Sequence, residues 1–84
     1  MPTVLRIGAY RFFFYSNENA EPPHIHISSG EGEAKYWLDP VELVWNRGFN
    51  ERQLRQIERY IIENRIMLEE AWLEFFGETD NDGE

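Results

Sequence analysis

The two histidines of the chain are the residues best suited to chemistry, and they lie in the segment Pro22-Pro23-His24-Ile25-His26-Ile27. Because side chains alternate along a β-strand, both imidazoles would point to one face and both isoleucines to the other. An imidazole exchanges protons near neutral pH and is also a common metal ligand. A pair of imidazoles on one strand face therefore predicts a site without naming its reaction.

A second strand is predicted beside the histidines. Glu33–Leu38 follows His24–Ser28 across the glycine-containing connection Ser29-Gly30-Glu31-Gly32, which is typical of a β-hairpin. A regular hairpin pairs Ser28 with Glu33, His26 with Lys35 and His24 with Trp37. With the preceding aromatic strand, one sheet face is predicted to carry Arg11, Phe13, Tyr15, His24, His26, Ser28, Glu33, Lys35 and Trp37. The other face would carry Phe12, Phe14, Ile25, Ile27, Ala34, Tyr36 and Leu38.

This polar and aromatic face has two interpretations. In the catalytic hypothesis it acts on RNA or another nucleotide-containing target. That hypothesis assigns acid–base chemistry to His24 and His26, phosphate binding to Arg11 and Lys35, and base stacking to Tyr15 and Trp37. In the binding hypothesis the same exposed aromatic face docks a partner protein, with the histidines and the lysine as its polar rim. The leading prediction is the catalytic one, a toxin-like protein that acts on RNA or another nucleotide-containing target, and the alternative is the non-catalytic binding module.

Metal binding is the less favoured use of the histidine pair. Two imidazoles on a strand supply two ligands, and an acidic residue could add a third. No acidic residue has a diagnostic spacing, however, and Lys35 opposite His26 would repel a cation. The sequence therefore predicts neither a metal site nor a cofactor.

The residue pattern predicts an α+β fold, with an antiparallel sheet of about four strands packed on one long C-terminal helix. The expected strands are Thr3–Ile7, Tyr10–Ser16, His24–Ser28 and Glu33–Leu38, while Val41–Trp45 is either a short fifth strand or a helical turn. From Asn50 the apolar period becomes helical. Asn50 and Gln53 fit a capping box, and Gly77 fits the C-terminal stop.

The helix carries more apolar surface than one small sheet can cover. The predicted core stripe is Leu54, Ile57, Ile61, Leu68, Trp72 and Phe75, interrupted at Asn64 by a kink or a polar contact. A second line of Ile62, Ile66 and Leu73 lies beside it, and Met67 and Ala71 widen the other flank. We therefore expect a homodimer, with the helix as the favoured seam. Arg52, Arg55 and Arg59 form a line along the helix that is read as a solvated face.

Charge and length restrict the remaining classes. The chain has 84 residues, no cysteine and a formal net charge of −8, which argues against a general nucleic-acid binder. Residues 1–77 are predicted to form one globular domain, and residues 78–84 an acidic tail that should be disordered because it has no apolar side chain. No apolar run is long enough to span a membrane and no signal-peptide core is present, so a cytoplasmic protein is expected.

Several segments together resemble one family of small bacterial proteins. They are the opening Met1–Arg6, the aromatic run Tyr10–Glu18, the segment Pro22–Ile27, the segment Gly32–Leu38, and Trp72 with Phe76-Gly77. The chain is similar in these segments to the domain of unknown function 4160 (DUF4160) family. The resemblance implies a small partner protein encoded by a neighbouring gene, a toxin–antitoxin-like two-gene module, or a role as a transcriptional regulator.

Overall fold

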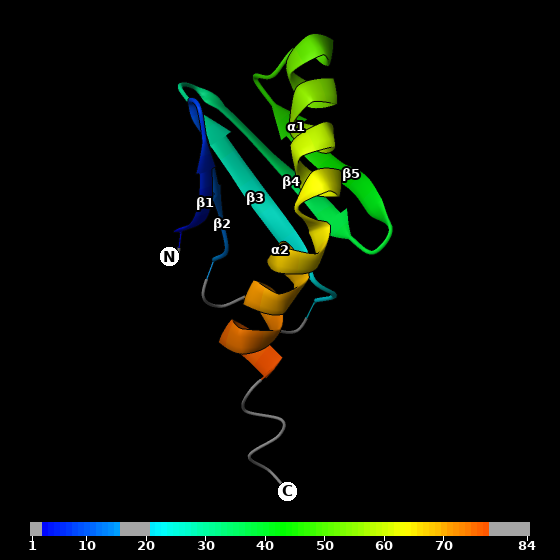
Figure 1. Ribbon diagram of the computed structural model, residues 1–84. Coiled ribbons are helices and arrows are strands. Elements are labelled where there is room, and N and C mark those ends of the chain that lie inside the picture. The colour runs from blue at the N-terminus through cyan, green and yellow to red at the C-terminus, as the bar shows by residue number, and fades with distance from the viewer. Residues whose placement is uncertain (1–2, 16–20, 78–84) are drawn as a thin grey trace, which may run out of the picture.

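A five-stranded antiparallel sheet and a broken C-terminal helix make up the protein, as Figure 1 shows. The computed structural model describes residues 3–15 and 21–77. The strands are β1 (Thr3–Ile7), β2 (Tyr10–Phe13), β3 (His24–Ser29), β4 (Gly32–Leu38) and β5 (Val41–Arg47). They are followed by α1 (Glu51–Glu63), α2 (Arg65–Trp72) and a π-helical turn (Leu73–Gly77). The α+β class is confirmed, whereas the count of about four strands and one helix needs correction.

Of the two alternatives for Val41–Trp45, the structure shows a fifth strand and not a helical turn. β5 pairs antiparallel with β4, beginning with Val41 opposite Leu38 beyond the short turn at Asp39-Pro40. The pairing shifts by one residue at Val44, because Leu43 lies opposite Tyr36 whereas Trp45 lies opposite Lys35. β5 is consequently an edge strand with β4 as its one neighbour in the sheet.

The predicted pairing of the histidine strand is confirmed. In the β3–β4 hairpin, Ser28 lies opposite Glu33, His26 opposite Lys35 and His24 opposite Trp37. Strand β2 is shorter than predicted and ends at Phe13. The apolar face lies under the helices, as predicted, and its side chains form the core with those of the helices. Its sheet members are Phe12, Ile25, Ile27, Ala34, Tyr36 and Leu38, and Phe14 joins them directly after β2.

The helix begins as predicted and breaks at Asn64. The backbone amide of Gln53 donates to Oδ1 of Asn50 at 2.8 Å, and the amide of Asn50 donates to Oε1 of Gln53 at 2.9 Å, which completes the capping box. At the break, the side-chain amide of Asn64 donates to the carbonyl oxygen of Tyr60 at 2.9 Å. The backbone amide of Asn64 donates to the same oxygen at 3.1 Å, so the carbonyl of Tyr60 accepts two hydrogen bonds at the break between α1 and α2.

The π-helical turn changes which aromatic residue enters the core. Phe75 was predicted to be buried but is 44 % exposed, whereas its neighbour Phe76 is buried against Trp72 with ring centroids 4.1 Å apart. A π-helix has more residues per turn than an α-helix, so the phase of the apolar stripe shifts by one position after Trp72. The second apolar line, formed by Ile62, Ile66 and Leu73, lies outside the core as the sequence pattern indicated, because all three side chains are exposed.

One prediction concerns residues that the structure does not describe, and another is checked on those that it does. The acidic tail of residues 78–84, and with it the proposed boundary at residue 77, lies outside the described residues. Within the described part of the chain, the helices are too short or too polar to cross a lipid bilayer.

Candidate functional site

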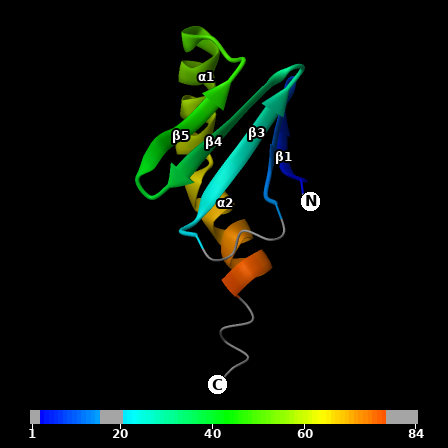
Figure 2. The ribbon, with the colours of Figure 1, turned by 180° about the vertical axis from the view of Figure 1, so that it is seen from behind.

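The two histidines are buried, although they lie on the sheet face turned away from the helices. The exposed fraction is 0 % for His24 and 2 % for His26. Figure 2 shows this face from the front, with α1 and α2 behind the sheet. Among the described residues no second layer of helix or strand covers it. The histidines are therefore not the polar rim of an open face, as the binding hypothesis expected, but lie beneath their own neighbours.

His26 lies at the centre of an aromatic cluster. The ring of Phe13, which is directly opposite on β2, stacks on the imidazole with centroids 5.5 Å apart. Tyr15 meets the imidazole edge-on at 4.5 Å, and Trp45 from β5 lies 6.0 Å away. Trp45 was missed by the sequence reasoning, because its place on this face depends on the strand assignment of β5. Three aromatic rings thus enclose the imidazole that was predicted to act as acid or base.

His24 joins this cluster to the helical layer. Its Nδ1 lies 2.9 Å from the carbonyl oxygen of Pro22, and because a carbonyl only accepts, Nδ1 donates the hydrogen. The imidazole lies 5.3 Å from that of His26 and 4.7 Å from the ring of Trp72 in α2. The rigid Pro22-Pro23 entry therefore fixes the ring orientation through a backbone contact, and the ring packs as part of the core.

The predicted phosphate-binding cations already have protein partners. Lys35 is buried, forms an ion pair with Glu21, and places its Nζ 5.0 Å from the centroid of the Trp37 ring. Arg11 lies over the Phe13 ring, with Cζ 4.3 Å from the centroid, and its Nε donates to Oγ1 of Thr3 at 2.9 Å. A phosphate that approached Lys35 would also meet the carboxylate of Glu21, which lowers its attraction.

Glu33 organises the other end of the face. The hydroxyl of Tyr15 donates to Oε2 of Glu33 at 2.9 Å, and Arg47 lies 3.2 Å from Oε1. Nδ1 of His26 is 3.9 Å from Oε2 of the same carboxylate. The structure thus brings together Arg11, Tyr15, His24, His26, Lys35 and Trp37 as predicted, but in a closed network of rings and ion pairs. In the described part of the chain, no three His, Asp or Glu side chains gather closely enough to hold a metal ion.

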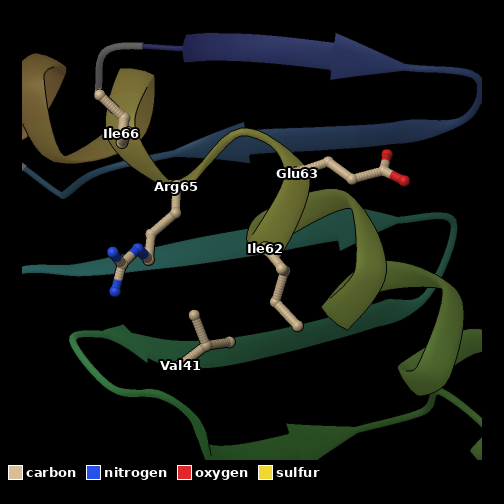
Figure 3. Close-up of a pocket in the computed structure, with 5 residues that line it drawn as sticks. All are labelled: Val41, Ile62, Glu63, Arg65 and Ile66. Carbon is tan, nitrogen blue, oxygen red and sulfur yellow. The ribbon is translucent and has the colours of Figure 1, made fainter.

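The open surfaces lie elsewhere, on β5 and on the helix. A depression of about 360 Å³ lies between them. Figure 3 shows the side chains of Val41 and Ile62 that line it, which point toward one another. Ile66, Glu63 and Arg65 complete its lining. Leu43, Val44 and Trp45 are also exposed, in three consecutive positions of the edge strand. These surfaces are mainly apolar, with Glu63 and Arg65 at the depression, and they hold neither histidine, so they are better suited to binding than to proton transfer.

Comparisons with known proteins identify a family but no activity. Residues 9–73 match the family model described as "Domain of unknown function (DUF4160)". This match covers most of the chain, including every predicted site residue. No curated protein and no solved structure matches the chain.

Proposed function

The chain belongs to the DUF4160 family, and we propose that it is a non-catalytic protein-binding module that binds a partner protein at strand β5. The observation that carries the proposal is the exposed fraction of three consecutive apolar residues on this edge strand: 39 % for Leu43, 37 % for Val44 and 38 % for Trp45. The resemblance makes the product of a neighbouring gene the first partner to test.

An edge strand has a backbone that can pair with another chain. β5 is seven residues long, and its outer edge faces no other strand of the described sheet. Such an edge binds an added strand through its backbone groups, while neighbouring side chains provide selectivity. Glu42 and Arg47 flank the apolar triplet with opposite charges. A partner strand with complementary charges would therefore pair in one register.

The pairing shift at Val44 makes this edge selective. A shift of this kind bends and twists a strand, which disfavours indiscriminate pairing between sheet edges. A partner must match the local bend, whereas a flat strand fits poorly. The exposed apolar triplet thus serves a specific partner better than general aggregation.

The test is complex formation between the purified protein and the product of its neighbouring gene. We expect a complex of defined mass by light scattering, and at least tenfold weaker binding for Val44→Lys, since a lysine on the edge disfavours strand addition. The matched control is Leu73→Lys, which adds the same charge at an exposed apolar residue outside the depression beside β5 and should leave partner binding unchanged. Wild-type protein that does not bind at tens of micromolar, or Val44→Lys that binds as wild type does, would contradict the proposal.

The toxin-like action on RNA that the sequence predicts stays a prediction. Its support is the gathering of His24, His26 and Lys35 on one face, and against it stands the burial of both imidazoles. Induced expression in bacteria separates the two functions. Growth arrest that persists in Val44→Lys but is lost in a folded His26→Gln variant would favour catalysis. Normal growth with the wild-type protein favours the binding module.

A further inference from the structure

We propose that two copies of the chain pair through the outward faces of their helices in antiparallel orientation, so that Arg59 of each copy lies against Glu69 of the other. This surface borders β5 at Val41 but does not include Leu43, Val44 or Trp45, and the inference does not depend on the proposed partner protein. Three features carry it: an exposed apolar stripe, arginines and glutamates along the same helix, and the equal distances from Asn64 of Ile62 and Ile66 and of Arg59 and Glu69.

The apolar stripe runs along the helix side opposite the core. The exposed fraction is 58 % for Ile62, 68 % for Ile66 and 59 % for Leu73. These positions are one and two further helical turns apart, so the three side chains share one line. Large aliphatic side chains exposed in a row mark an interaction surface more often than isolated ones do.

The arginines of α1 and the glutamates that follow Ile66 lie in different halves of the helix, although α1 also holds Glu51, Glu58 and Glu63. Before Ile62 the helix carries Arg52, Arg55 and Arg59, which with Gln56 line a depression of about 600 Å³. After Ile66 it carries Glu69, Glu70 and Glu74. Residues at intervals of three or four share one side of a helix. One such series is Arg55, Arg59, Ile62, Ile66, Glu69 and Leu73. The ridge read from the sequence as merely solvated is therefore the basic end of a patterned face.

The pattern is self-complementary about Asn64. In an antiparallel pair with its two-fold axis there, residues equally distant from Asn64 along the chain face each other. Ile62 then meets Ile66 of the second copy, and Arg59 meets Glu69 of the second copy. A parallel pair would instead place arginine against arginine and glutamate against glutamate. Closed two-fold symmetry requires this kind of surface, in which one patch complements itself.

A second copy fits this face better than other occupants do. A nucleic acid would be attracted to Arg52, Arg55 and Arg59 but repelled by the glutamates that continue the face. A uniformly acidic protein would match one half only. The chain itself has a formal net charge of −8, so copies repel at long range, and the antiparallel arrangement brings each basic segment to an acidic one. The same helix supplies both halves of the required complement.

Charge reversal tests the orientation as well as the dimer. By light scattering or sedimentation, wild-type protein should form dimers at micromolar concentration. Arg59→Glu alone and Glu69→Arg alone should each weaken the dimer at least tenfold, because each places like charges together at both symmetric contacts. An equimolar mixture of the two variants should restore dimers. In the mixed pair one helix is acidic at both positions and the other is basic at both.

Three further variants complete the design. Arg6→Glu makes the same charge change on the exposed side of β1 and should leave the dimer unchanged. Ile66→Glu should give monomers with a wild-type circular dichroism spectrum. Val44→Lys should still dimerise, which separates this seam from the β5 surface. The proposal is overturned if the wild-type protein is monomeric, if both single reversals dimerise as wild type does, or if their mixture stays monomeric.

Discussion

The outward face of the sheet and the outward face of the helix both point away from the interface between the two layers. The exposure of their side chains is the reverse of what the residue types lead one to expect. The outward face of the sheet holds the histidines and the lysine, yet His24, His26 and Lys35 are all buried. The outward face of the helix holds isoleucines, yet Ile62 and Ile66 are exposed. Buried polar groups and exposed apolar rows are the informative exceptions to the usual distribution. Here both occur in one small domain.

The difference shows that residue type alone does not locate a functional surface. The sheet face closes because aromatic side chains from neighbouring strands lie over the imidazole of His26, so burial is achieved within a single layer. Beside the exposed helix residues, β5 contributes Val41 at Ile62 and Ile66, and both isoleucines still remain exposed. The exposed apolar residues of the helix must stay in water or meet another chain, and the second choice is favoured by the hydrophobic effect.

The sharpest test of the comparison replaces one residue from each face by alanine. His26→Ala removes a ring packed among Phe13, Tyr15 and Trp45, and we expect a loss of about 2–4 kcal/mol in the free energy of unfolding. Ile66→Ala removes an exposed side chain and should cost less than about 0.5 kcal/mol in the monomer. Denaturant unfolding at a concentration below that of dimer formation measures both values.

The opposite order of the two effects would contradict the comparison. If His26→Ala left stability unchanged, the imidazole would not be part of the packed structure, and its role as a reactive group would regain support. If Ile66→Ala destabilised the monomer by more than about 1 kcal/mol, the helix face would be packed against the chain itself.

The sequence predicted well what depends on alternation and on local capping. The pairing of His26 with Lys35 follows from the period of two and a short glycine-containing turn, and the helix start at Asn50 follows from its cap. Both are short-range properties of the chain. They need no knowledge of how the layers close.

The errors come from features that depend on the assembled structure. Whether His24 and His26 are open to solvent depends on rings contributed by β2 and β5, and Trp45 joins only if β5 is a strand. The ion pair of Lys35 with Glu21 joins residues from different segments. The exposure of Phe75 depends on a π-helical turn that a constant period of 3.6 cannot predict.

The interface between the two layers provides a second, smaller test. Tyr36 lies beneath the helix, and its hydroxyl donates to the carbonyl oxygen of Leu54 at 3.3 Å. Burial, with a smaller contribution from Glu58, raises the pKa of Tyr36 from 10.0 to about 12. The folded state thus favours the protonated phenol. The stability it contributes is complete below pH 10 and is lost as the pH rises through about 12.

Two measurements follow for Tyr36. Phenolate absorbance should show an ionisation step near pH 12, and Tyr36→Phe should remove that late step. The substitution should also cost about 1 kcal/mol, because the carbonyl of Leu54 loses its donor. Ionisation of Tyr36 near pH 10 in the folded protein would mean that the layers admit water, and the contrast between a closed interior and an open helix face would weaken.

The smallest expected effect concerns residues 78–84, which lie beyond the acidic half of the helix in sequence. They carry Glu78, Asp80, Asp82 and Glu84 and no apolar side chain, so they have little surface to bury on ordering. Deleting them should leave Tm within about one degree of the wild-type value. The deletion also changes the formal net charge from −8 to −4, which reduces repulsion between copies and should leave the dimer equal or slightly tighter. A drop of several degrees would show that these residues dock on the domain. Loss of the dimer would show that they, rather than Glu69 and Glu70, occupy the arginine ridge of the second copy.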